Sequence, residues 1–551
     1  MVVSKGRDNM VQFDPLKYSF ASHRNVVYAK KGMACSTSPI ASQVGLEILK
    51  SGGNAMDAAV AMAAAMPLLE PTGNGLGSDC FALVWIEAEQ KLYGLNASGR
   101  APRNLSAKLV RELGFDQMPK TGWIPTMVPG APAGWAELNR RFGTKPLKEL
   151  FAPAIASARD GVPVQVNLQP QWEKDSKRIL AALEQNPAPH VWWRQVFLKE
   201  DGAPYRSGDI FRWEEYAQTL EELAATNCES YYRGALMEKI VAFSRETGGY
   251  FSEEDFQNYY PEWVEPISTD YKGYRVWEIP PNGHGITVLM ALNILKGLSL
   301  PEQRDCPETY HKILESIKLA FADTKTYVAD PKYMKTRVED LLSEEYAAKR
   351  RSLIGDKAIL PEAGAPSCGG TVYLCTADPQ GNMVSFIQSN YTTFGSGVAI
   401  PGTGISLQNR GGNFSLDEQS DNCLAGGKRS YHTIIPGFLT KDGKAVGPFG
   451  VMGAFMQPQG HVQVIVNTID YHMNPQECLD APRFQWVGEK KVQLEREVPA
   501  HIAQKLADMG HQVEIVNTNL GMGRGEIIWR MEDGTLVGGT EPRADGTIAA
   551  W

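Results

Sequence analysis

The sequence predicts a layered α+β fold, in which helices cover sheets built from short strands. Stretches with apolar residues near 3.6-residue spacing dominate from about residue 102 to residue 354. Short runs of strand character lie before this region, at residues 80–97, and after it, from residue 371 onward. Helices that flank two separate sets of short strands are typical of layered α+β or α/β proteins.

The composition is that of an ordinary globular protein, and it excludes several classes of function. The chain has 551 residues, of which 43% are hydrophobic and 21% charged, with a net charge of −8. This length suits two to four average domains or one large interwoven domain. Both signs of charge are scattered and there is no basic block, so we expect no nucleic-acid partner.

Nothing in the sequence predicts a membrane segment. The longest apolar run, residues 58–69, contains Pro67 and falls short of the ~20 residues that a membrane helix needs. The N-terminal residues 1–30 lack an apolar signal region and are expected to form a loose arm. We therefore expect a cytoplasmic protein that has no membrane contact.

Cysteine and histidine spacing offers no metal or disulfide framework. The eight cysteines are spread singly, and the nine histidines show neither an H-x-x-x-H nor an H-x-H pair. We expect free, mostly buried thiols, no metal site and no cofactor.

The first elements are two helices and a strand hairpin. A helix near residues 44–49 breaks at residues 51–53, and Asn54 with Asp57 is typical of a cap on the next, buried helix. The glycine loop at residues 73–77 follows a helix and precedes a strand, which is the wrong order for a nucleotide-binding loop. It is expected to be a turn into the strand at residues 80–86, which pairs with residues 91–97.

The middle of the chain is expected to be helical and to end in a linker. Residues 134–143 and 308–328 show the clearest helical spacing. Residues 355–368 are rich in Pro, Gly and Ala and have no periodicity, so they read as an exposed linker in which a cut just beyond them is sterically feasible.

Strands dominate after the linker. Residues 371–378 and 383–389 are expected to form a hairpin around the turn at residues 379–382. Further strands are expected within residues 397–402, 431–440, 444–452 and 491–497. Residues 461–471 fit a helix or a strand by pattern, and we favour the helix.

The stretch CGGTVYLCTAD contains two glycines directly before a threonine that opens a strand. Glycine contributes little to a strand, so one interpretation is a bulge or a tight entry turn. The other is that the Gly370–Thr371 bond must be reachable by the Thr371 hydroxyl. If that hydroxyl attacked the carbonyl of Gly370, the freed α-amine, with a pKa of ~7.7–8.0, would serve as a base beside its own hydroxyl.

A family resemblance supports the second interpretation. TVYLCTADPQGNMVSF followed by SNYTTFGSGVAIPGTGISLQN resembles the γ-glutamyltransferase family of N-terminal-nucleophile hydrolases. GMACSTSPIASQVGLEILKSGGNAMDAAVA, VPGAPAGWAELNRRFGTKPLKELFAPAIASARDG, DYKGYRVWEIPPNGHG and NTIDYHMNPQECLDAPRFQW are similar to other parts of that family, so the resemblance covers most of the chain from about Lys31.

The resemblance implies a four-layer αββα sandwich and a precursor that cuts itself between Gly370 and Thr371. The heavy fragment would consist of residues 31–370 behind the N-terminal arm, and the light fragment of residues 371–551. Both would belong to one interwoven domain, and a homodimer of such heterodimers is an assembly that we consider.

The resemblance also implies the catalytic groups. Thr371 matches the nucleophile, because Asp378 lies at the expected offset after it. Ser389 matches a second hydroxyl that hydrogen-bonds the nucleophile; the alternative is a serine at a strand end facing solvent. Gly453 and Ala454 match the pair whose backbone N–H groups stabilise the oxyanion. Alanine retains that N–H but restricts φ.

The expected substrate-binding positions depart from the γ-glutamyl pattern. Ser98 replaces the arginine that holds the substrate carboxylate, and Arg100, two positions on, either supplies that charge or faces solvent. His432 is interpreted as a neutral hydrogen-bond partner of substrate or as a satisfied strand histidine. The substrate-binding candidates are Arg100, Asn390, Tyr391, Arg410, Asn413, His432 and Thr433.

These departures predict an amidohydrolase for a small acidic substrate. Serine does not replace a bidentate arginine without a large loss of carboxylate binding. The sequence is closer to family members described as acylases or oxamate amidohydrolases, and Arg100 and Arg410 favour a small acid that carries an amide. Two alternatives stay open: hydrolysis or transfer of γ-glutamyl groups, including those of glutathione, and an uncut scaffold without catalysis.

Overall fold

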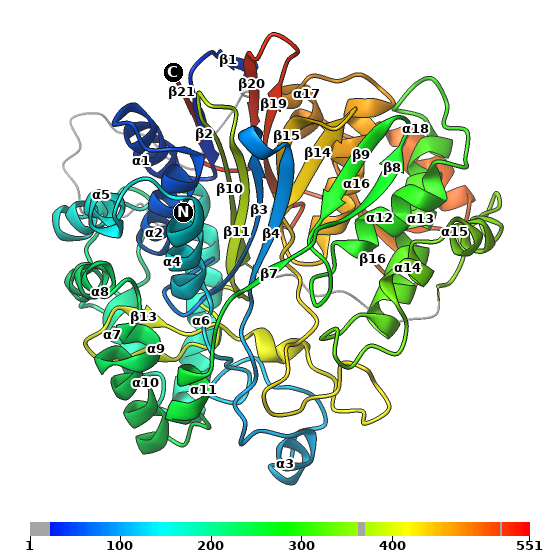
Figure 1. Cartoon of the computed structure of the whole chain (residues 1–551). Helices are drawn as coiled ribbons and strands as arrows, with labels where there is room; N and C mark the ends of the chain where they lie inside the picture. The colour runs from blue at the N-terminus through cyan, green and yellow to red at the C-terminus, as the bar shows by residue number, and fades with distance from the viewer. Residues whose placement is uncertain (1–22, 362–369, 518–520) are drawn as a thin grey trace.

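Two antiparallel sheets pack face to face at the centre of the molecule, and helices cover the outer side of each (Figure 1). The computed structural model describes residues 23–361, 370–517 and 521–551. The four layers form an αββα sandwich, as expected from the resemblance.

The first central sheet has seven strands. In spatial order they are β1 (Val27–Ala29), β20 (Leu536–Thr540), β19 (Arg524–Arg530), β15 (Lys444–Met452), β14 (Gly437–Lys441), β9 (Tyr274–Glu278) and β8 (Ile267–Tyr271).

The second central sheet also has seven strands. Their order is β21 (Thr547–Ala550), β2 (Met33–Ser36), β10 (Gly370–Ala377), β11 (Met383–Tyr391), β3 (Asp79–Ile86), β4 (Lys91–Ala97) and β7 (Glu262–Val264). Both sheets contain strands from before and after residue 370, so the two portions of the chain share one core.

One helical layer covers the second sheet, on the left of Figure 1. It contains α1 (Pro39–Lys50), α2 (Ala55–Leu69), α4 (Ala131–Phe142) and α5 (Leu147–Asp160). Beyond it lie α6 (Gln169–Gln185), α7 (Val191–Phe197), α8 (Glu214–Ala225), α9 (Ser230–Arg233), α10 (Ala235–Glu246) and α11 (Glu253–Gln257), while α3 (Ala107–Glu112) stands apart.

The other helical layer covers the first sheet, on the right of Figure 1. It contains α12 (Ile286–Leu295), α13 (Pro307–Tyr327) and α16 (Met456–Ile469), with α14 (Val338–Leu341), α15 (Glu344–Arg351), α17 (Pro475–Asp480) and α18 (Ala500–Asp508) around them. The minor strands are β5 (Val162–Pro163), β6 (Ile210–Phe211), β12 (Ala399–Ile400), β13 (Ile405–Ser406), β16 (Phe484–Gly488), β17 (Lys491–Glu495) and β18 (Gln512–Val516).

Helix α2 shows why the left layer is stable. Its fifteen residues are all buried, as a helix that is apolar on every side must be. Asn54 and Asp57 form the expected reciprocal cap, each side chain accepting a hydrogen bond from the other's backbone N–H.

In the described residues no helix is both long and apolar enough to cross a membrane.

Several expected elements are confirmed, and three differ. Residues 80–97 form the β3–β4 hairpin, and residues 461–469 belong to helix α16. Residues 27–29, which we placed in a loose arm, instead pair with β20; residues 1–22 lie outside the described part. The strand expected within residues 431–440 begins only at Gly437, because Pro436 has no N–H for the ladder.

The third difference concerns the linker before residue 370. Residues 355–361 are mostly exposed, as expected, but Ala358 is buried and its N–H donates to the carbonyl of Met509. The rest of the linker, residues 362–368, lies outside the described residues, as does Gly369.

Candidate active site

Thr371 lies at an irregularity near the start of β10. Gly370 is the register partner of Tyr391 on β11, but the register shifts before Val372 reaches Gln388. Between these two pairs β10 advances by two residues and β11 by three, so the extra residue of this bulge lies on β11, and Ser389 and Asn390 stand opposite Thr371. The bulge, which was one of the two interpretations of the Gly-Gly-Thr stretch, is therefore present.

The hydroxyls of Thr371 and Ser389 lie 3.1 Å apart, and both side chains are buried. Ser389 has the strand parity of Ile387, which packs into the core shared with the first sheet, so it does not face solvent. Ser389 Oγ also accepts a hydrogen bond of 2.8 Å from the backbone N–H of Tyr391. The second hydroxyl expected beside the nucleophile is therefore in place.

Tyr391 adopts a strained backbone conformation with φ of +77°. Positive φ is rare for a residue with a bulky side chain, and such strain persists only where surrounding contacts enforce it. Here it accompanies the turn of the Tyr391 N–H back toward Ser389 Oγ. The strain belongs to the arrangement that holds the hydroxyl pair.

Asp378 anchors the far end of the hairpin. Its Oδ1 accepts from the backbone N–H groups of Gln380 and Asn382, and its Oδ2 accepts from the N–H of Ala55 at the start of α2. These bonds close the turn and tie it to the helical layer. Asp378 thus positions β10 and lies at the opposite end of the strand from Thr371.

Gly453 and Ala454 follow β15 and precede α16. Gly450 on β15 lies so close to the ring of Tyr373 that a Cβ there would be 2.3 Å from it, which brings this strand against β10. Ala454 has φ of +52°. Within the described residues no group accepts a hydrogen bond from either amide N–H of the pair. Two such donors at a helix N-terminus suit an oxyanion.

The guanidinium of Arg410 lies beside this site against the Tyr391 ring. Its side chain is fully buried in the turn formed by Arg410–Asn413, and Nη1 donates to Thr433 Oγ1 at 2.6 Å. The guanidinium lies 4.6 Å from the centre of the Tyr391 ring. Within the described residues Nε and Nη2 have no hydrogen-bond partner. Burial lowers the Arg410 pKa to about 10, which still leaves it charged at neutral pH.

Two buried side-chain amides, of which only that of Gln408 contacts Arg410, have nitrogens without a partner among the described residues. Asn390 Oδ1 accepts from Ser78 Oγ at 2.8 Å, which leaves its Nδ2 without a partner among the described residues. The Nε2 of Gln408 is likewise unpaired. Gln408 was not expected from the sequence. Buried donors without acceptors are costly unless a ligand supplies acceptors, so this region suits an acceptor-rich ligand.

Arg100 lies in a separate ion-pair cluster. Its Nη2 is 2.9 Å from Glu262 and its Nη1 is 3.5 Å from Asp330, and it also donates to the carbonyl of Gly427. About a quarter of the side chain is exposed. Arg100 therefore does not face free solvent, because carboxylates surround it. Arg410, in contrast, is connected to Thr371, since its guanidinium contacts Tyr391, the Tyr391 N–H donates to Ser389, and Ser389 lies beside Thr371.

His432 is engaged within the protein. Its Nε2 lies 3.0 Å from Asp79 Oδ2, and its Nδ1 accepts from the backbone N–H of Ile434 at 3.4 Å. Burial and the nearby Arg410 hold the His432 pKa well below its usual value, so the ring is neutral. These contacts match the interpretation of His432 as a histidine whose hydrogen bonds are all made within the protein.

Asn413, another predicted substrate-binding residue, is also engaged within the protein, because its side chain donates to the carbonyl of Tyr431.

Asp79 is a second residue near the site that the sequence reasoning missed. Burial raises its pKa to about 7, against the opposing effect of Arg410. A carboxylate at the first position of an apolar strand was the available signal, since buried acids are rare without a partner. Its partner, His432, comes from a segment about 350 residues later.

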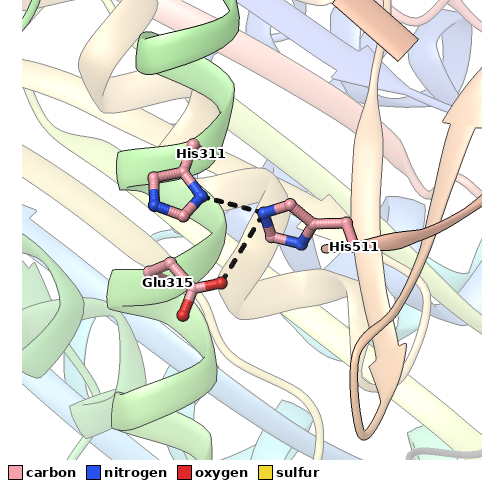
Figure 2. A group of neighbouring side chains, drawn as sticks. All are labelled: His311, Glu315 and His511. Carbon is pink, nitrogen blue, oxygen red and sulfur yellow. Dashed lines mark hydrogen bonds and ion pairs between the residues drawn. The ribbon is translucent and has the colours of Figure 1, made fainter. Parts of the chain in front are cut away.

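One cluster of side chains has the composition of a metal site. His311 and Glu315 on α13 and His511 after α18 point toward one another (Figure 2), and all three are buried. His311 Nδ1 lies 2.9 Å from His511 Nε2, which lies 3.7 Å from Glu315 Oε1. Two histidines and a carboxylate are a ligand set that zinc uses.

The charges around this cluster disfavour a metal. Lys318 Nζ donates to Glu315 at 2.7 Å and lies 3.3 Å from His511 Nδ1. His311 Nε2 donates to the carbonyl of Gly355, so each ring nitrogen already has a matching donor or acceptor. The ion pair balances its own charge, and a divalent cation would add two positive charges beside a buried ammonium. We therefore interpret the cluster as a structural contact that links α13 to the segment following α18.

The four-layer sandwich and the threonine at the start of a central strand define an N-terminal-nucleophile hydrolase. Comparison with protein families agrees: residues 41–551 match the model of gamma-glutamyltranspeptidase. The chain belongs to the gamma-glutamyltranspeptidase family and is a hydrolase of that family.

Relatives in this family carry several names. The chain is 35% identical to the glutathione hydrolase-like YwrD proenzyme of Bacillus subtilis (94% of this chain, 98% of the relative). It is 33% identical to the oxamate amidohydrolase proenzyme of Klebsiella pneumoniae subsp. pneumoniae (94% and 98%). The crystal structure of cephalosporin acylase from Bacillus halodurans matches with a TM-score of 0.94 at 54% identity (98% and 99%).

Proposed function

We propose that this protein cuts its own chain between Gly370 and Thr371 and then hydrolyses the amide bond of a small acid. The observation that carries the acid preference is the buried guanidinium of Arg410, whose Nε and Nη2 have no partner among the described residues. A carboxylate accepts two parallel hydrogen bonds from such a fork and neutralises its charge. The Gln408 amide, whose oxygen accepts from the Arg410 backbone N–H and whose Nε2 has no partner among the described residues, supports the same class of ligand.

The proposed reaction uses Thr371 at the start of β10 and the backbone amides of Gly453 and Ala454 between β15 and α16. Thr371 Oγ1 attacks the amide carbonyl while the Thr371 α-amine, freed by processing, takes the hydroxyl proton. The N–H groups of Gly453 and Ala454 stabilise the tetrahedral oxyanion. The C–N bond breaks, the leaving amine receives the proton, and an acyl-threonine ester is left. Water then attacks the ester by the same route and releases the acid.

The names of the relatives support amides of two kinds. Oxamate is a small carboxylate with an amide, and the oxamate amidohydrolase proenzyme is 33% identical to this chain. A cephalosporin acylase acts on an acyl amide, and that relative is 54% identical. A screen of amide substrates should therefore begin with oxamate and glutaryl amides. The name glutathione hydrolase-like at 35% identity keeps γ-glutamyl transfer as a second candidate, tested with a γ-glutamyl anilide and an amine acceptor.

Intact mass under denaturing conditions tests the processing step. We expect two fragments, the smaller beginning at Thr371, and we expect Thr371→Ala to remain a single chain without amidase activity. A single wild-type mass would favour the uncut scaffold. Amide hydrolysis by Thr371→Ala would show that another group is the nucleophile.

Two arginine variants test the acid preference. Arg410→Gln should raise the KM for an acidic amide by about 10- to 100-fold, because a charge-assisted hydrogen bond contributes ~1.5–3 kcal/mol. Arg100→Gln removes the same charge from the Glu262 and Asp330 cluster and serves as the matched control. The opposite result, a large effect at Arg100 and none at Arg410, would assign carboxylate binding to Arg100.

A further inference from the structure

The carboxylate of Asp79 shares a face of the second sheet with the hydroxyl pair. Asp79 opens β3 and is the register partner of Ser389 on β11. Directly opposite residues on antiparallel strands point to the same side of the sheet. Asp79 also has the parity of Phe81, which packs in the core shared with the first sheet. A negative group is thereby built into the wall of the site.

Asp79 holds His432 in one tautomer. Asp79 Oδ1 accepts from the backbone N–H of Gly99 at 2.9 Å, and Oδ2 accepts from His432 Nε2–H at 3.0 Å. Because His432 Nδ1 accepts from Ile434, the ring is neutral with its proton on Nε2. The two side chains form a coupled pair that gains or loses a proton as a unit.

Arg410 and Asp79 attract each other without a direct hydrogen bond between them among the described residues. The Arg410 charge opposes the effect of burial on Asp79, and the Asp79 charge does the same for Arg410. The charged and titratable groups that act on Asp79 or are acted on by it are Arg410, Arg429, His432, Tyr231, Tyr259 and Cys80. Among these groups, Arg410 is the one that is fully buried and has two guanidinium nitrogens without a partner among the described residues.

We propose that Asp79 is a positioning and specificity-determining residue which makes the binding of an anionic acyl group depend on the uptake of one proton by the Asp79–His432 pair. This inference rests on the proposed function, since it concerns the acid that Arg410 receives. An anion that pairs with Arg410 enters a buried site where Asp79 already carries negative charge. Like charges in a buried site favour protonation of one of them.

The direction of the pH effect follows from the charge. Burial places the Asp79 pKa at about 7, so the pair carries its extra proton below that pH and a net negative charge above it. Anion binding is therefore strongest at low pH and weakens as pH rises through 7. If only the protonated pair binds the anion, the apparent Kd rises about tenfold between pH 6 and pH 8.

Isothermal titration calorimetry on the processed enzyme measures this proton directly. Oxalate and, in a separate series, glutarate are titrated between pH 6 and pH 8.5 in two buffers of different ionisation enthalpy, and the difference in heat gives the number of protons taken up. Oxamide, uncharged and of the same shape, is the ligand control. The α-amine of Thr371 also titrates, at ~7.7–8.0, but contributes equally to wild type and variants.

Asp79→Asn is the test variant, because asparagine keeps the shape and the acceptor for His432. We expect it to lose the component of proton uptake centred near pH 7 and to flatten the tenfold change in Kd. Asp330→Asn is the matched control: Asp330 is also buried and faces an arginine, Arg100, away from the hydroxyl pair. Asp330→Asn should show the same proton uptake and the same change of Kd with pH as the wild type.

The outcomes separate this inference from the proposed function. Oxalate binding with the same proton uptake in Asp79→Asn and wild type overturns the role of Asp79 and leaves the acid preference standing. Absence of binding by both oxalate and glutarate at every pH, in an enzyme that hydrolyses amides, overturns both. If Asp79→Asn does not fold or process, wild type decides: no uptake centred near pH 7 overturns the inference.

Discussion

Replacing Ser389 by alanine tests whether the buried hydroxyl pair is the catalytic arrangement. In the wild type, Ser389 Oγ lies 3.1 Å from Thr371 Oγ1 and accepts from the backbone N–H of Tyr391 at 2.8 Å. The substitution removes one oxygen and creates little space, so the sheet register should persist. It leaves the Tyr391 N–H, which holds a strained conformation, without this acceptor.

The magnitudes follow from the two hydrogen bonds. A buried N–H that loses its acceptor costs about 1–3 kcal/mol of folding free energy. The bond to Thr371 joins two neutral groups and should contribute about 0.5–1.5 kcal/mol to orienting the nucleophile. At 1.36 kcal/mol for each factor of ten, this lowers kcat by about 2- to 13-fold. Self-processing uses the same hydroxyl and should slow by a similar factor.

Ser385→Ala supplies the matched control on the same strand and face. Ser385 is equally buried, and its hydroxyl lies 2.8 Å from that of Tyr373 instead of that of Thr371. It should lose comparable stability with unchanged kcat and processing. The assays are denaturant unfolding, intact mass against time, and steady-state amide hydrolysis. Wild-type rates in Ser389→Ala, or an equal slowing in Ser385→Ala, would refute the reasoning.

The other predictions concern the buried ion pair, the oxyanion donors and metals. Glu315→Gln should destabilise the protein by about 3–5 kcal/mol in denaturant unfolding, because it leaves the buried Lys318 ammonium without its partner. Glu345→Gln in the exposed pair with Lys349 should leave stability almost unchanged, and equal effects of the two variants would contradict the burial argument. Ala454→Gly should retain processing and gain up to ~1 kcal/mol in stability because φ of +52° suits glycine, and Ala454→Val should process more slowly, so a faster valine variant would argue against the assignment. Dialysis against EDTA should leave kcat unchanged; loss of activity that zinc restores would reverse the interpretation of the cluster in Figure 2.

Local patterns were enough for the hairpin that holds the nucleophile. Strand alternation on both sides of the turn at residues 379–382, with Asp378 at its start, predicted β10 and β11. The reciprocal cap at Asn54 and Asp57 was predictable for the same reason, since the groups that interact lie three residues apart. Short-range hydrogen bonds leave a signature in the sequence that needs no knowledge of the fold.

The substrate-binding residues were less predictable, because their roles depend on distant partners. The sequence offered Arg100 as the main source of positive charge, because it lies two positions after the replaced arginine, and Arg410 as an additional one. The fold gives Arg100 the carboxylates of Glu262 and Asp330, and leaves Arg410 with two unpaired nitrogens among the described residues. Asp79 escaped notice since its partner, His432, is remote in the chain.

By itself, the sequence determined the α+β class, the family resemblance and the position of Thr371 at the head of a strand, because each rests on contiguous residues. Only the tertiary structure decided that the strand register shifts at Thr371, that Ser389 faces it, and that Arg410 instead of Arg100 has unpaired donors among the described residues. These depend on pairing between segments that the two sheets bring together from both sides of residue 370, and the free energy of a buried charge is set by all its neighbours.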